Sequence, residues 1–328
     1  MATGILLLSF SCEKETIIDP PIIGDDPIVE ETGANDSTGI MEIPIGSDVA
    51  LANFFSTNIE AATQHFSQNA NAVISLTGEK GTYLSLAPNS LIDADGDLIT
   101  GLVDIELIEV SKKSEMVLMN KATMGKKGPN HTTLISQGEF YVSISQFGTE
   151  LTLTSPMTLS TPIDDYDPSM RKFVNISDEE DLLWEMAADS ILNEGEDSTG
   201  VALSYEILPG EWGWTNIDKF YSDPRPKTEI FAELPEGFDD TNTEVYISYD
   251  GESNALAQFD VWTGDRFSEH YGLIPIGLEV HFIAVGIVGD ELNCSIQSAT
   301  IIDNHVQNID DFAAITEDAL ITLIDALP

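Results

Sequence analysis

Residues 81–107 read GTYLSLAPNSLIDADGDLITGLVDIEL, a series of short apolar runs separated by turn residues. Apolar and polar side chains alternate over 82–86 and again over 102–107. Such alternation is typical of β-strands that bury one face. The segment 93–97, which is rich in Asp and Gly, has the composition of a tight hairpin turn. This stretch therefore predicts paired, half-buried strands.

The same pattern continues on both sides of this stretch. Strand patterns precede it at 73–76 and follow it at 140–145 and 151–153. From about residue 200 they return, at 228–234, 243–249, 255–262, 278–288 and 291–302. Many short strands separated by turns predict a mainly β fold with two β-sandwich-like domains.

Three segments instead show the apolar spacing of helices. The first covers about residues 48–62. The second begins with the capping box Ser177–Glu180. Its apolar face would be formed by Leu182, Leu183, Met186, Ala187 and Ile191. The third follows Thr316 as its N-cap and ends near Ala326. We therefore predict a helix before the first sandwich, a short helix that joins the two β-domains, and a C-terminal helix.

About 64–162 resembles a β-sandwich domain that is frequent in surface lipoproteins of Bacteroidetes. The resemblance is carried by Gly81 to Ser90, Asp93 to Gly96, Thr100 to Leu107, Lys113 to Met116 and Leu134 to Tyr141. The stretch EWGWTNIDKFY at 211–221 resembles a segment that follows the sandwich in the same lipoproteins. That domain is distantly similar to the interaction sandwich of ankyrins and netrin-receptor tails. The resemblance implies a protein-binding sandwich without catalytic residues.

The N-terminus has the layout of a bacterial lipoprotein signal. The apolar run ILLLSFS at 5–11 ends on Cys12, and a polar segment with several prolines follows. In such signals the cysteine becomes the acylated first residue of the mature chain. The run is too short to span a bilayer, and it lacks the basic start of most export signals. An apolar end without an anchor is the alternative.

These observations divide the chain into five predicted segments. They are a lipoprotein signal at 1–12 that is cleaved before Cys12, a flexible acidic tether at 13–46, an N-terminal helix plus β-sandwich interaction domain at 47–165, a helical connector at 166–200, and a second β-domain with its C-terminal helix at 201–328. We expect the protein to be lipid-anchored at the outer membrane or cell surface.

The charge of the chain limits its partners. It has 57 Asp and Glu residues against 13 Lys and Arg, a formal net charge of −44. Such a field repels phosphate, so nucleic acid is excluded as a partner. The same acids repel one another in the compact state, so we expect the fold to depend on salt or divalent cations. The expected partners are other envelope or surface proteins, copies of this chain, and the membrane through the lipid anchor.

One acidic segment is a candidate metal site. Asp93, Asp95 and Asp97 alternate around Gly96 and would offer hard oxygen ligands to Ca²⁺. The segment is not an EF-hand loop, because its sixth position is Leu98. The alternative is a solvated hairpin turn in which Asp and Gly are favoured for their backbone freedom. Calcium is the one cofactor that the sequence suggests.

No catalytic motif is recognisable in the sequence, so we expect a non-enzymatic structural or protein-interaction module, stabilised by calcium if the aspartates bind it. The competing hypothesis is an envelope glycan-binding or glycan-cleaving protein. Its support is a possible ligand platform of Trp212, Trp214 and Tyr221, with both indoles on one face if the chain is extended.

Three further features have two explanations each. The lysine cluster would contact an acidic partner or belong to a solvated loop; its members are Lys112, Lys113, Lys121, Lys126 and Lys127. Cys294 is expected to be a buried core thiol rather than a nucleophile, because no basic neighbour is visible. His281 lies on an apolar strand pattern, where a structural histidine is favoured over a ligand or base.

Overall fold

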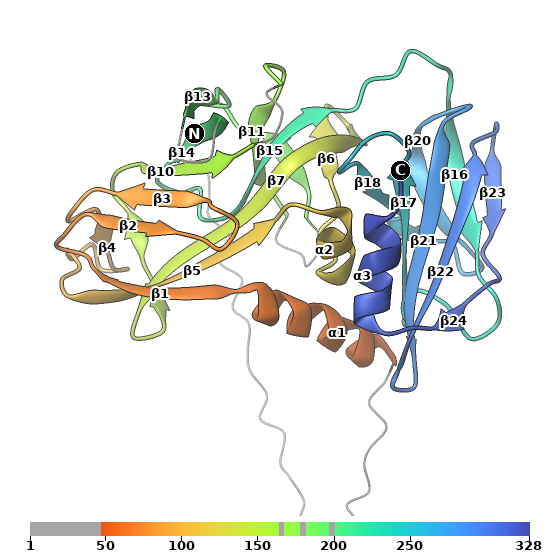
Figure 1. Ribbon diagram of the computed structural model, residues 1–328, viewed down its shortest axis with the longest axis horizontal. Helices are drawn as coiled ribbons and strands as arrows, with labels where there is room; N and C mark the ends of the chain where they lie inside the picture. Colours follow the sequence, from red (N-terminus) through yellow and green to blue (C-terminus); the bar gives the residue numbers. More distant parts are fainter. Residues whose placement is uncertain (1–46, 164–166, 178–181, 197–200) are drawn as a thin grey trace, which may run out of the picture. The chain divides into compact units, whose positions relative to one another are not determined.

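The computed structural model describes residues 47–163, 167–177, 182–196 and 201–328, which form a mainly β chain (Figure 1). The predicted first helix is confirmed as α1 (Ser47–Ala62). The predicted last helix is confirmed as α3 (Glu317–Asp325), where the Thr316 side chain accepts a hydrogen bond from Ala319 N. A short helix that the sequence did not predict, α2 (Lys113–Leu118), follows the strand β5 (Leu102–Val110). The mainly β, sandwich-like fold class is confirmed.

The first sandwich packs an eight-stranded sheet against a five-stranded one. The larger sheet contains β1 (Gln64–Asn69), β5 (Leu102–Val110), β6 (Met124–Lys127), β7 (Asn130–Gln146), β8 (Thr149–Glu150), β11 (Arg171–Asn175), β12 (Trp184–Met186) and β15 (Gly213–Phe220). The smaller sheet contains β2 (Ile74–Thr77), β3 (Tyr83–Leu86), β10 (Met157–Pro162), β13 (Asn193–Glu196) and β14 (Val201–Ile207). A separate pair joins β4 (Leu91–Ile92) to β9 (Thr152–Leu153).

Alternating apolar residues of both sheets form the core between them. Leu84 and Leu159 of the smaller sheet and Ile105 and Val142 of the larger sheet are all buried in one cluster. The two layers also share a buried hydrogen bond, since the Tyr205 hydroxyl lies 2.6 Å from Thr215 Oγ1. The period-two pattern of the sequence is therefore realised as the inner face of a sandwich.

Part of the larger sheet closes into a ring. Its strand order runs β7-β15-β11-β12-β6, and β6 pairs again with β7. A separate core cluster gathers the buried side chains Leu134, Phe173, Leu182 and Trp184 from this part of the chain. Gly125 permits the closure, because a Cβ at this position would lie 2.6 Å from the Leu134 side chain. The ring is thus held together by its own apolar interior.

The predicted helical connector is wrong. Its described part contains strands β11, β12 and β13 instead, and residues 166, 178–181 and 197–200 lie outside the description. Leu182 and Trp184 are buried while Glu185 is exposed, which is the period of a strand. β12 pairs with β11 and completes the ring through Trp184 and Gly125. Packing of the indole inside the ring therefore overrides a helix-like spacing of apolar residues.

The second sandwich consists of a four-stranded and a five-stranded sheet. The four-stranded sheet contains β16 (Lys227–Glu233), β19 (Val261–Trp262), β20 (Phe267–Pro275) and β23 (His305–Asn308). The five-stranded sheet contains β17 (Thr243–Tyr249), β18 (Leu256–Gln258), β21 (Glu279–Val288), β22 (Glu291–Thr300) and β24 (Ala313–Ala314). Phe282 of one sheet stacks on His305 of the other with ring centroids 5.5 Å apart.

The segment from α2 to β6 joins the two sandwiches. Thr123 N donates to Leu256 O at 3.0 Å. Asp325 of α3 accepts from Ser114 Oγ at 2.6 Å and from Lys112 Nζ at 2.9 Å, which holds α3 beside α2 (Figure 1). Buried apolar residues of both sandwiches also belong to one continuous core cluster.

The topology differs from the predicted segments in one further respect. β14 and β15 lie after residue 200, yet they pair with strands of the first sandwich. The described residues, from 47 to 328, belong to one compact unit. The predicted lipoprotein signal, its Cys12 and the tether at 13–46 lie outside the described residues.

Candidate functional site

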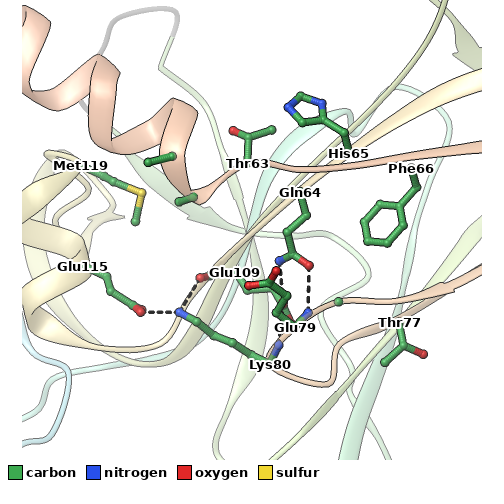
Figure 2. Close-up of a pocket in the computed structure, with 13 residues that line it drawn as sticks. Thr63, Gln64, His65, Phe66, Thr77, Glu79, Lys80, Glu109, Glu115 and Met119 are labelled. Atoms are coloured by element: carbon green, nitrogen blue, oxygen red, sulfur yellow. Dashed lines mark hydrogen bonds and ion pairs between the residues drawn. The ribbon is translucent and has the colours of Figure 1, made fainter.

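A polar concave surface surrounds Lys80 in the first sandwich. Two adjoining cavities of about 570 Å³ and about 1020 Å³ share Glu79, Lys80 and Glu109. The β2–β3 turn, the end of β5 and the first turn of α2 bring these residues together (Figure 2). We call this surface the Lys80 groove.

The Glu109 carboxylate organises the turn that forms one wall. It accepts hydrogen bonds from Lys80 N at 2.9 Å, from Thr82 N at 3.0 Å and from Gln64 Nε2 at 2.8 Å. Gly78 is required beside it, because a Cβ there would overlap the Glu109 side chain. A carboxylate with three N–H donors acts as a rigid template for the backbone rather than as a free base.

The Lys80 side chain crosses the groove, and its ammonium group, like the Glu109 carboxylate, is held by several partners. Its Nζ donates to Glu109 O at 2.7 Å and forms an ion pair with Glu115 (Figure 2). The other oxygen of Glu115 accepts from Ser111 N at 2.8 Å, so α2 is tied to the same network. The groove therefore presents a preorganised set of charges, suited to recognising a polar partner rather than to activating a nucleophile.

The predicted calcium ligands lie on an exposed turn. Asp93 Oδ1 accepts from Asp95 N at 3.0 Å and from Asp97 N at 2.9 Å, and Gly96 has a φ of 85°. Within the described ranges, no three His, Cys, Asp or Glu side chains are arranged to hold a metal ion. The turn explains why Asp93 and Gly96 stand here, and calcium binding stays a prediction.

The predicted aromatic platform lacks the extended backbone that it requires between its two indoles, and sugar binding there stays a prediction. Trp212, Trp214 and Tyr221 are all partly buried against the core. Gly213 between the two indoles has a φ of 90°, so the extended conformation on which the platform depends is interrupted there. Trp214 instead contacts the Tyr141 ring at 5.5 Å. These rings serve packing, which weakens the glycan hypothesis.

The lysine cluster is divided between the interior and the surface: Lys112 and Lys127 are exposed and Lys126 is half-buried. Lys113 and Lys121 are buried, and desolvation lowers the pKa of Lys113 to about 8. Lys126 pairs with Glu185 at 3.2 Å, and Lys127 lies 5.2 Å from the centroid of the Phe220 ring. The two buried lysines, Lys113 and Lys121, belong to neither a solvated loop nor a docking patch, whereas the other three reach the surface.

Sequence analysis missed a buried acid pair in the ring. Glu139 and Asp218 are both 0% exposed. Glu139 pairs with Asn216, and Asn216 with Phe173, so Glu139 and the ring core share one face of the sheet. Within the described chain, both Asp218 oxygens and Glu139 Oε2 are buried without a hydrogen-bond partner. The sequence does contain one sign of a buried acid, because Glu139 directly precedes Phe140 in a strand pattern.

Burial raises the pKa of both carboxyls well above their ordinary values. For Glu139 the charge of Asp218 adds to this effect and that of Lys121 opposes it. The nearby Ser136 hydroxyl opposes the pKa shift of Asp218, but it donates its hydrogen bond to Asn216 Oδ1 at 2.8 Å. The fold therefore favours protonated carboxyls at these two positions.

No protein-family model matches the sequence, and no curated protein matches it either. Among the described residues, no helix combines the length and apolar character needed to cross a membrane.

Proposed function

We propose that this protein is a non-enzymatic, lipid-anchored protein of the cell envelope that binds a partner protein in the Lys80 groove. The observation that carries the proposal is the groove itself, whose charged side chains are fixed by Glu109 and Glu115. A surface ordered before binding loses little conformational entropy when a partner docks, which favours recognition. The apolar run before Cys12 supports anchoring.

The chemistry of the groove indicates a basic partner segment. Glu79 is exposed on the rim, and Glu115 lies beside Lys80 on the wall. The whole chain carries a net charge of −44, so it attracts positively charged segments over distances comparable to the Debye length. We therefore expect a Lys- or Arg-containing loop or strand of another envelope protein to bind there.

Anchoring is tested by labelled palmitate in the native host. We expect label on the wild-type protein and none on Cys12→Ala, which should move from the membrane to the soluble fraction. Several acyl chains are needed for this retention, since one myristoyl chain binds membranes with only about 10⁴ M⁻¹. A Cys12→Ala protein that stays in the membrane fraction would contradict lipid anchoring.

Partner binding is tested by co-purification from native membranes. Glu79→Lys reverses a charge on the groove rim and should release a partner that the wild type retains. Glu236→Lys is the matched control, because Glu236 is also exposed but lies between β16 and β17. Equal recovery of all partners with the two variants would place recognition elsewhere on the protein.

A further inference from the structure

A separate cavity lies in the second sandwich, distant in sequence from the Lys80 groove. Its volume is about 420 Å³, within the range of about 300–1,000 Å³ typical of small-molecule sites. β22, β24 and α3 supply mostly apolar walls, which include Ile296, Ile315, Leu323 and Leu327. We call this the α3 cavity.

The α3 cavity has one strongly polar wall. His281 of β21 lines it, and His281 Nδ1 lies 2.7 Å from Asp250 Oδ1. In the tautomer that donates its Nδ1 proton to this carboxylate, Nε2 is the hydrogen-bond acceptor. Both side chains are less than one-fifth exposed, at 19% and 17%. The pair therefore offers a sheltered acceptor backed by a negative charge.

We propose that the α3 cavity binds a small aliphatic amine in its ammonium form. The hydrocarbon part would contact the apolar walls, and the ammonium would donate a hydrogen bond to His281 next to the Asp250 carboxylate. An aliphatic carboxylate of the same length would be repelled by the charge of Asp250, which pairs with His281, and by the acidic field of the chain. An alcohol would gain the apolar contacts but not the charge attraction. Charge complementarity thus selects the amine.

Cys294 provides a built-in reporter of occupancy. It lines the α3 cavity, is buried as the sequence predicted, and has a pKa raised by burial to about 12. The chain has two cysteines, so full-length protein with Cys12→Ser retains this thiol alone. Its modification by methyl methanethiosulfonate, followed by mass spectrometry, measures access to the cavity.

The experiment compares octylammonium, 1-octanol and octanoate at matched ionic strength. At an octylammonium concentration ten times its Kd, modification of Cys294 should slow about tenfold, in proportion to occupancy. Octanoate should not protect, and octanol should protect less than the amine. Asp250→Asn should remove the preference for the amine over octanol. Asp260→Asn should keep it, because Asp260 pairs with His270 rather than with a residue of this cavity.

A second variant guards against misfolding as an explanation. Ala314 is exposed on β24 and lines the cavity, so Ala314→Trp should fill the space without disturbing the core. Calorimetric binding of octylammonium should be lost in this variant while its melting temperature is unchanged. The proposal is overturned if octanoate protects Cys294 as well as octylammonium does, if no ligand protects it, or if Ala314→Trp binds the amine normally.

Discussion

Replacing Asp218 by asparagine is expected to stabilise the fold, and the gain should grow as the pH rises. Burial raises the pKa of Asp218 in the folded protein, while the unfolded chain has an ordinary value of about 3.9. Above that value the unfolded chain releases a proton that the folded protein retains. Stability is therefore lost with rising pH, about tenfold in the folding equilibrium constant per pH unit for each retained proton.

Asparagine removes this linkage at one position without removing volume. Its amide also lies near Glu139, whose Oε2 is buried without a partner in the described structure. Urea unfolding between pH 5 and pH 8 measures the effect as a difference in slope from the wild type. Repulsion among the exposed acids is nearly the same in the variant and the wild type, so it cancels in the difference between their slopes. Asp95→Asn on the exposed turn is the control and should leave the slope unchanged. A destabilised Asp218→Asn with the wild-type slope would contradict the protonated pair.

Trp184→Ala is expected to destabilise the protein by about 3–5 kcal/mol, the usual cost of deleting a buried large aromatic side chain. Trp184 is 0% exposed and lies in the ring cluster with Leu134 and Phe173. Its Nε1 donates to Ala122 O at 3.3 Å, so the substitution also leaves a buried carbonyl unpaired. This is a large fraction of a typical net stability of about 5–15 kcal/mol.

Denaturant unfolding of Trp184→Ala should show a lower midpoint. Trp262→Ala is the matched control, because Trp262 is only half-buried at an edge strand against Phe267. Trp262→Ala should lower the free energy of unfolding clearly less than Trp184→Ala does. If the two substitutions cost the same, the closed ring around Trp184 would not be the stabilising feature described above. A helix at 182–191 would leave the ring open, so this comparison also tests the corrected connector.

The strands were predictable because their signal is local. Alternation at 82–86 and 102–107 specifies a strand wherever one face is buried, and the Thr316 cap marks a helix start in the sequence itself. The ring was not predictable, because Trp184 finds its place only through pairing with β11 and β6. Secondary structure in such a segment is decided by long-range packing, which apolar spacing alone does not report.

The candidate sites could not be predicted from the sequence for a related reason. Glu109, Lys80 and Gln64 are far apart in the chain and meet only when β1, β5 and the β2–β3 turn come together. Residues such as Asp93 and Trp214 are conspicuous in the sequence because chemically similar residues lie close to them along the chain. The first caps its own turn and the second packs against Tyr141. Residues that lie close together in the sequence thus indicate local turns, whereas the residues of an assembled site come from distant segments of the chain.

Crosslinking from inside the Lys80 groove tests whether this surface binds a partner. A photoreactive amino acid placed at Glu79 should give a discrete adduct with another envelope protein in native cells, because Glu79 is exposed on the rim. The same amino acid at Glu236 should not give that adduct. High salt during illumination should weaken the adduct, since the contact is between opposite charges. No adduct from position 79, or the same adduct from both positions, would contradict recognition through the Lys80 groove.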